Sequence, residues 1–238
     1  MYVISNDERR DEMINYRIAI SSMAFCILLS IAGTAATGYG LPSFPGTSNS
    51  SSSNMTATVN MQTKLVADFV AGETSVLSSQ ADMTKALGLS DQSAKLEANI
   101  AALKSGATIK AMEDATAESK KTADTIASMK LGTMKLSADA KVTMIHAIPE
   151  YITGVVALIK LKPDYSSFMS AAQKQISSAS LMEVSNVKDK LSVGMFVASN
   201  GPGYTESLGN TTSDFITYAK GNNISIPKDA TAALGFNP

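Results

Sequence analysis

YITGVVALIKL, residues 151–161, is apolar on nearly every side of a helix and contains a single charged residue, Lys160. A helix with this pattern is stable in water when other helices surround it. The stretch therefore predicts the central core helix of an all-α domain. Ser137 is expected to cap the start of this helix, and Pro149 is expected to bend it, because proline lacks a backbone donor.

On the N-terminal side of this segment, apolar residues recur at intervals of three and four, which is typical of amphipathic helices. No segment has the alternating pattern of a convincing strand. The helices predicted here cover residues 56–87, 91–104 and 107–131. Gly88 is expected to end the first of them, because glycine adopts the left-handed conformation that follows many helices.

The C-terminal part of the chain predicts a fifth helical segment that begins at KPDYSSF, with Asp164 as its cap, and runs to Val197 as one helix or two. Gly201, Pro202 and Gly203 are expected to end it, because both residue types disfavour helices. A sixth helix up to Gly221 and a short helix started by Pro227 would complete the chain. These patterns together predict a single antiparallel bundle of about six helices.

The N-terminus has the pattern of an export signal. Arg17 precedes a stretch without charge, Ile18–Ala36, and small residues at the end of that stretch suit a signal peptidase. Its length also approaches the roughly 20 residues that cross a bilayer, so an uncleaved inner-membrane anchor is the alternative. We predict a signal peptide or signal anchor at 1–36, a flexible Pro/Gly/Ser linker at 37–55 and a helical domain at 56–238. Whether translation starts at Met1 or Met13 stays open.

Composition argues against several classes of function. Every arginine lies before residue 37, so the remaining chain lacks the side chain best suited to phosphate, and we expect no nucleic-acid partner. Cys26 is the only cysteine, which leaves stability to the core. His146 is the only histidine, and paired with Glu150 it offers too few ligands for a metal site. No nucleophile elbow or phosphate loop is present, so we expect a non-enzymatic protein without a cofactor.

One predicted helix carries a polar stretch, EDATAESKKT, at residues 113–122. Lys110 with Asp114, and Glu118 with Lys121, are spaced to pair across one helical turn. The candidate interaction face consists of Glu113, Asp114, Glu118, Lys120 and Lys121. The predicted function is therefore a structural or partner-binding role in the cell envelope, for a periplasmic, cell-surface or secreted chain whose partner is an envelope protein or a membrane surface.

The alternative prediction is a membrane-active bundle. The segment Val142–Leu161 contains few charged side chains and is long enough to span a bilayer. A pore-forming or lipid-interacting bundle would bury this segment in solution and insert it on contact with a membrane. The same apolar pattern is also expected of the core helix of any water-soluble bundle.

Overall fold

The computed structural model describes residues 50–228 and residue 234. Within these residues every regular element is a helix, so the all-α prediction is confirmed. The predicted signal or anchor segment and most of the predicted tail helix lie outside the described residues. The elements are α2 (Ser50–Ala86), α3 (Ser90–Ser105), α4 (Ile109–Ser128), the 3-10 turn η1 (Leu131–Thr133), α5 (Ala138–Lys160), α6 (Lys162–Ser178) and α7 (Val184–Gly221).

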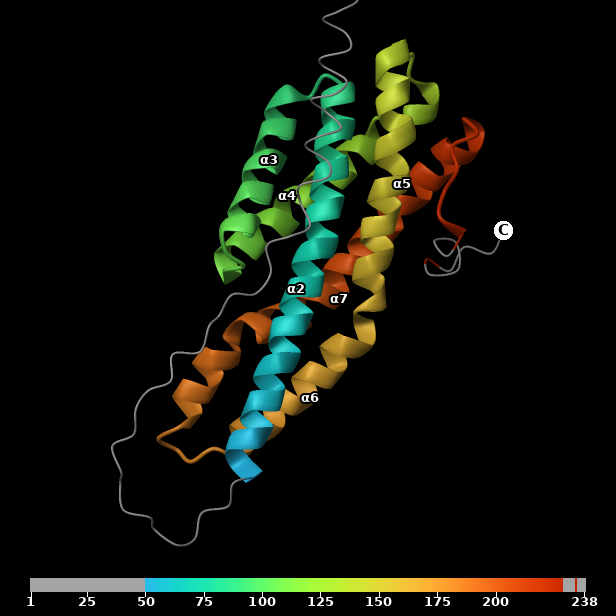
Figure 1. Ribbon diagram of the computed structural model, residues 1–238. Coiled ribbons are helices and arrows are strands. Elements are labelled where there is room, and N and C mark those ends of the chain that lie inside the picture. The colour runs from blue at the N-terminus through green and yellow to red at the C-terminus, as the bar shows by residue number, and fades with distance from the viewer. Residues whose placement is uncertain (1–49, 229–233, 235–238) are drawn as a thin grey trace, which may run out of the picture. The chain divides into compact units, whose positions relative to one another are not determined.

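The helices from α2 to α5 alternate in direction along the chain (Figure 1). α3 turns back along α2, α4 turns back along α3, and α5 runs antiparallel to α2. α6 follows α5 after a single residue, Leu161, and continues in the same general direction, after which α7 returns along both of them. α7 contacts α2, α4, α5 and α6, so it links the two ends of the described fold.

α5 lies at the centre of the core, as the sequence predicts. Tyr151, Ile152, Val155 and Leu158 are fully buried among residues of the neighbouring helices. α5 also approaches α2 closely, because glycines replace larger side chains at the contact. A Cβ atom on Gly154 would lie 2.9 Å from a methyl group of Val76, so a larger residue there would push the two helices apart.

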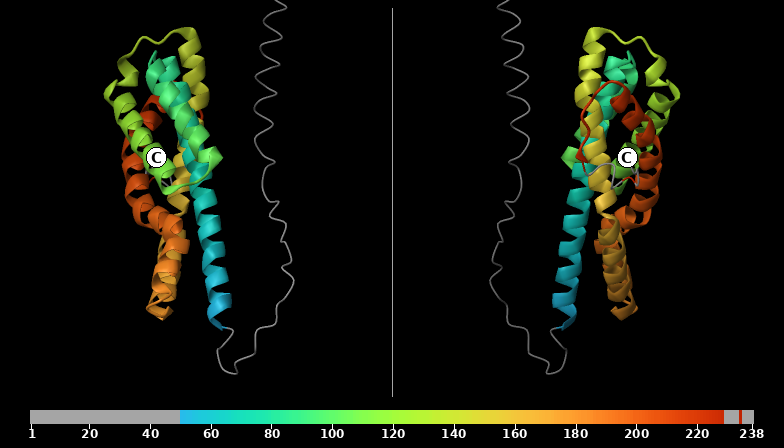
Figure 2. Two further views of the ribbon diagram at one scale, coloured as in Figure 1. Left: turned by 90° about the vertical axis from the view of Figure 1, so that its left-hand side faces the viewer. Right: turned by 90° about the vertical axis from the view of Figure 1, so that its right-hand side faces the viewer.

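The predicted helix end at Gly201–Gly203 is wrong. α7 continues through Pro202 to Gly221, although it changes direction near the proline (Figures 1 and 2). Proline removes only one backbone donor, and two neighbouring side chains add hydrogen bonds to carbonyl groups on either side of it. Asn200 Nδ2 donates to the carbonyl of Phe196 at 2.9 Å, and Thr205 Oγ1 donates to the carbonyl of Gly201 at 2.7 Å. Packing of α7 against the other helices therefore overrides the local preference.

Two predicted helix boundaries also differ from the structure. α2 begins at Ser50, inside the predicted linker 37–55, and Met55 already packs against the core. Each residue added to a helix gains one backbone bond, so a core contact near the end extends the helix into a polar run. α6 begins at Lys162, which places Asp164 in its first turn and not at its cap, because Pro163 fixes the start of the helix.

Two predicted caps are confirmed. Ser137 accepts a hydrogen bond from the backbone N–H of Ala140 at 3.2 Å and begins α5. Gly88 has a φ of +78° directly after α2, and the N–H of Leu89 donates to the carbonyl of Thr84 at 2.8 Å. These bonds satisfy backbone groups that each helix end would otherwise leave unpaired.

Candidate functional site

The predicted interaction face lies on α4, and most of it is exposed. Glu113, Asp114, Lys120 and Lys121 are exposed, whereas Glu118 is half-buried. The predicted pair of Lys110 and Asp114 is confirmed, with Nζ and Oδ1 2.7 Å apart. The predicted pair of Glu118 and Lys121 is wrong, because these residues form no ion pair within the described part of the chain.

Glu118 and Lys121 instead line a groove between α4 and the turn that joins α2 to α3. The groove has a volume of about 380 Å³ and mixes acidic, basic and amide groups. Its lining residues are Gly88, Leu89, Ser90, Asp91, Gln92, Lys95, Glu118 and Lys121. We call it the α3–α4 groove.

Glu118 carries the feature of this groove that most favours a ligand. Its Oε1 atom is shielded from solvent and accepts no hydrogen bond within the described residues. A shielded carboxylate oxygen without a donor costs free energy, so a donor supplied from outside would bind favourably there. Gln92 holds the wall of the groove in place, because its Nε2 donates to Thr122 Oγ1 at 3.0 Å.

A second group of polar residues lies inside the core and was not predicted from the sequence. Glu73 of α2 is 0% exposed. Tyr204 of α7 places its hydroxyl 2.5 Å from Glu73 Oε2 and 2.7 Å from the Oγ of Ser119 in α4. A phenol has a single proton to donate, so the Ser119 hydroxyl or a protonated Glu73 must supply the second bond. We call these three residues the Glu73 cluster.

Burial determines the protonation of the Glu73 cluster. Loss of solvent raises the pKa of Glu73 from its usual 4.5 to about 8, and the bond from Tyr204 offsets only part of that rise. Burial and the nearby Glu73 also raise the pKa of Tyr204 well above its usual value. At neutral pH both groups are therefore protonated and uncharged, which is how a carboxyl group without a cation can stay in a core.

The Glu73 cluster joins three helices that are distant in sequence. Gln80 adds a further link, because its Nε2 donates to the carbonyl of Ser119 at 2.9 Å. One sequence signal could have located Glu73: it lies four residues after Phe69 and four before Leu77, in register with the apolar stripe of α2. The residues that bond within the Glu73 cluster are set by how α4 and α7 pack against α2, and the sequence of α2 alone does not reveal that packing.

A second groove lies where α7 bends. It has a volume of about 680 Å³ and lies between the α5–α6 junction and the part of α7 that follows Pro202. Tyr165 and Thr205 form its inner wall, and Tyr165 is nearly fully buried against Gly201. Burial raises the pKa of Tyr165 to about 12, so its hydroxyl stays protonated. Lys162 and Glu206 are exposed at the rim and give this groove both charges.

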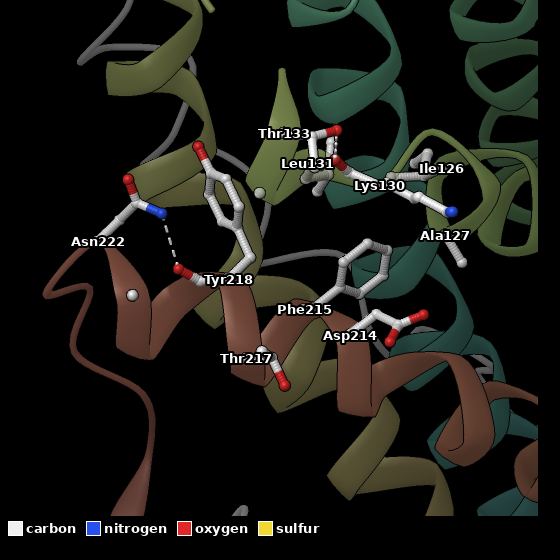
Figure 3. Close-up of a pocket in the computed structure, with 12 residues that line it drawn as sticks. Ile126, Ala127, Lys130, Leu131, Thr133, Asp214, Phe215, Thr217, Tyr218 and Asn222 are labelled. Carbon is white, nitrogen blue, oxygen red and sulfur yellow. Dashed lines mark hydrogen bonds between the residues drawn. The ribbon is translucent and has the colours of Figure 1, made fainter. Parts of the chain in front are cut away.

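A third groove, of about 580 Å³, lies between the end of α7 and the turn that follows α4. Figure 3 shows the rings of Phe215 and Tyr218 in this groove, with the amide of Asn222 bonded to the backbone oxygen of Tyr218 at 2.9 Å. Lys130 has a φ of +48° and forms the left-handed turn on the opposite wall. The buried side-chain oxygens that have no partner lie elsewhere, on Glu73, Gln80, Glu118 and Tyr165.

The described residues contain no group of three or more His, Cys, Asp or Glu side chains arranged to hold a metal ion. His146 and Glu150 are both on the exposed side of α5. No family model, curated protein or solved structure matches this chain.

Proposed function

We propose that the chain is an exported, non-enzymatic helical-bundle protein that binds a partner in the cell envelope through the α3–α4 groove. The observation that carries this proposal is the shielded Oε1 of Glu118, which has no hydrogen-bond donor within the described residues. A partner that offers an ammonium, guanidinium or amide donor would satisfy this oxygen.

The charges around the groove favour a protein or peptide partner. Lys95 and Lys121 lie beside Asp91 and Glu118, so the surface presents both signs within one small area. A partner with the complementary charges pairs with this arrangement in only one orientation. Mixed charges of this kind therefore give specificity for one partner over others. Lys120 and Lys121 also line a shallow patch further along α4, which extends the same surface.

The Glu73 cluster supports a binding role over catalysis. Glu73 has the pKa best placed for acid–base chemistry near neutral pH, but its side chain is fully buried. A substrate would reach it only if α2 and α7 separated. A partner can reach the charged groups of the α3–α4 groove without any unfolding of the chain.

Charge reversal across the groove tests this proposal. Glu118→Lys together with Lys121→Glu, made in the full chain, should abolish cross-linking to the partner in producing cells, because both contacts reverse sign. The matched control is Lys64→Asp with Asp68→Lys, which reverses an exposed ion pair on α2 whose atoms are 2.7 Å apart. Unchanged cross-linking in the groove variant, or equal loss in the control, would contradict the proposal.

Membrane insertion of Val142–Leu161 is the second candidate. The helical run Ala138–Ser178 is the one part of the described chain long and apolar enough to span a bilayer, with a mean hydropathy of 1.6 in its most apolar window. Val142 and Ile145 are exposed on one side of it. Half of that window is buried in the fold, as expected of a core helix, so insertion would require α5 to leave α2.

Dye release from lipid vesicles distinguishes the two candidates. Insertion predicts rapid release that Val155→Lys abolishes, because a charge in the middle of the segment opposes entry into hydrocarbon. Val142→Lys at the exposed end is the control and should release dye nearly as well. An intact bundle that releases no dye would leave partner binding as the proposed function.

A further inference from the structure

The turn between α6 and α7 exposes two large apolar side chains next to each other. Leu181 is 99% exposed and Met182 is 91% exposed, more than any other large apolar residue in the described chain. Isolated exposed apolar residues are common on protein surfaces. An adjacent pair that protrudes from the tip of a helical hairpin presents nearly all of its apolar surface to the surroundings, which favours an apolar partner.

This turn has a fixed structure that holds the pair outward. Glu183 Oε2 accepts bonds from the hydroxyl of Ser180 at 2.7 Å and from its backbone N–H at 3.3 Å. The backbone N–H of Glu183 donates in return to the carbonyl of Ser180 at 2.9 Å. Leu181 and Met182 lie between these bonded residues, and both side chains are exposed in the turn that the bonds hold.

The start of α2 lies at the same end of the described fold as this turn, which both views in Figure 2 show. Gln62 connects the two regions, because its Nε2 donates to the carbonyl of Lys190 at 2.9 Å and its Oε1 accepts from the N–H of Gly194 at 3.0 Å. The chain therefore enters the described fold beside the exposed pair.

The preceding residues include the uncharged stretch Ile18–Ala36, the predicted anchor. Only residues 37–49 separate it from α2, and even fully extended they reach at most about 45 Å. A bilayer that held Ile18–Ala36 would thus lie within reach of Leu181 and Met182. Two apolar side chains bind a bilayer only marginally by themselves, but a tether raises their local concentration at the surface.

We infer that the α6–α7 turn docks on the surface of the bilayer that holds Ile18–Ala36, with Leu181 and Met182 inserted among the lipids. This inference rests on the anchored form of the proposed export. The exposed charges near the tip are nearly balanced, which points to apolar insertion and not to attraction by anionic lipid. They are Lys174, Glu183, Lys188, Asp189 and Lys190. In the docked state α2 would point away from the bilayer. The α3–α4 groove, at the far end of α2, would then be free to bind a partner.

Fluorescence quenching in phosphatidylcholine vesicles tests the docking. The full chain carries Cys26→Ser and Ser178→Cys, with an environment-sensitive dye on the new cysteine beside the tip. Spin-labelled lipid should quench this dye several-fold more than a dye on Asp91→Cys. Asp91 follows the far end of α2, and the 37 residues of α2 span about 55 Å. Adding Leu181→Ser and Met182→Ser should remove the difference, whereas Val142→Ser with Ile145→Ser should keep it.

Three results would overturn the inference. Equal quenching at residues 178 and 91 would show that the tip does not approach lipid. A dye signal that depends on protein density and not on spin-labelled lipid would show that the tip pairs with a second copy. An intact mass that lacks Ile18–Ala36 in chains purified from producing cells would remove the tether, while leaving partner binding in the α3–α4 groove to its own test.

Discussion

Glu73 and Leu181 depart from the usual distribution of side chains in opposite ways. Glu73 is a carboxyl group that is 0% exposed, whereas Leu181 is an apolar side chain that is 99% exposed. The first is stable in the core because Tyr204, which is itself bonded to Ser119, forms a hydrogen bond with it and because burial keeps it protonated. Leu181 has no such compensation: it lies in a turn that bonds between Ser180 and Glu183 hold, and its side chain stays uncovered there.

The difference separates two kinds of unusual side chain. A buried polar one affects the stability of the fold, and an exposed apolar one affects binding to a partner. A buried carboxyl group that is hydrogen-bonded to another helix affects stability, because it is desolvated whenever the chain folds. An exposed apolar group barely affects stability, because its surroundings are nearly the same in the folded and unfolded chain. Substitutions at the two places should therefore separate cleanly into effects on folding and effects on binding.

The largest expected effect comes from Glu73→Gln. Because the folded chain holds the Glu73 proton up to a pKa of about 8, this group stabilises the fold fully below pH 4.5, and the contribution is lost as pH rises to about 8. The wild-type free energy of unfolding should fall by about 1.4 kcal/mol per pH unit across that range. Urea unfolding of Glu73→Gln should lack this slope, whereas Glu97→Gln on exposed α3 should retain it. Parallel curves for all three chains would contradict the assignment.

Gly201→Ala should have the next largest effect. An added Cβ would lie 2.6 Å from the Cζ atom of Tyr165, so the ring or the helix would have to shift. We expect a loss of about 1–3 kcal/mol in the free energy of unfolding. Gly203→Ala is the matched control in the same bend, because no atom lies within 4 Å of its added Cβ. Equal midpoints for the two variants in thermal unfolding would show that the bend is not packed as described.

Tyr204→Phe should cost somewhat less, about 1–2 kcal/mol at pH 6, because it removes the bonds to Glu73 and Ser119 while keeping the ring. The ring's edge-on contact with Phe69, at a centroid distance of 6.3 Å, should persist. Urea unfolding of the single variants and of Tyr204→Phe with Glu73→Gln gives the coupling between the two side chains. Strictly additive losses would mean that the two groups do not interact.

The smallest effect is expected at the exposed pair. Leu181→Ser with Met182→Ser should change the free energy of unfolding by less than about 0.5 kcal/mol, because both side chains are almost fully solvated in the folded chain. Thermal unfolding without lipid measures this directly. A loss comparable to that of Gly201→Ala would show that the pair is buried in solution, and the contrast with Glu73 would disappear.

Local patterns in the sequence predict much of this fold. The apolar stretch 151–161 identifies the core helix, and Ser137 and Gly88 mark helix ends, because caps depend on nearby backbone groups. The continuation of α7 through Pro202 could not be predicted in this way. Contacts with helices that are distant in sequence keep α7 helical there.

The candidate sites were less predictable than the fold. The charged residues of α4 follow from their spacing on the helix, but the groove that Glu118 shares with Lys95 depends on how α3 packs beside α4. Glu73 lies in an apolar stripe of α2, which indicates burial. The stripe alone does not show that Tyr204, far along the chain, would bond to it.

The most direct test of the buried Glu73 is a titration of its carboxyl carbon by 13C NMR in the full chain. One glutamate carboxyl should titrate near pH 8, far from the usual 4.5, and its signal should disappear in Glu73→Gln. If every glutamate carboxyl titrates near its usual value, Glu73 is ionised at neutral pH. The enclosed cluster and the contrast with the exposed tip would then both be wrong.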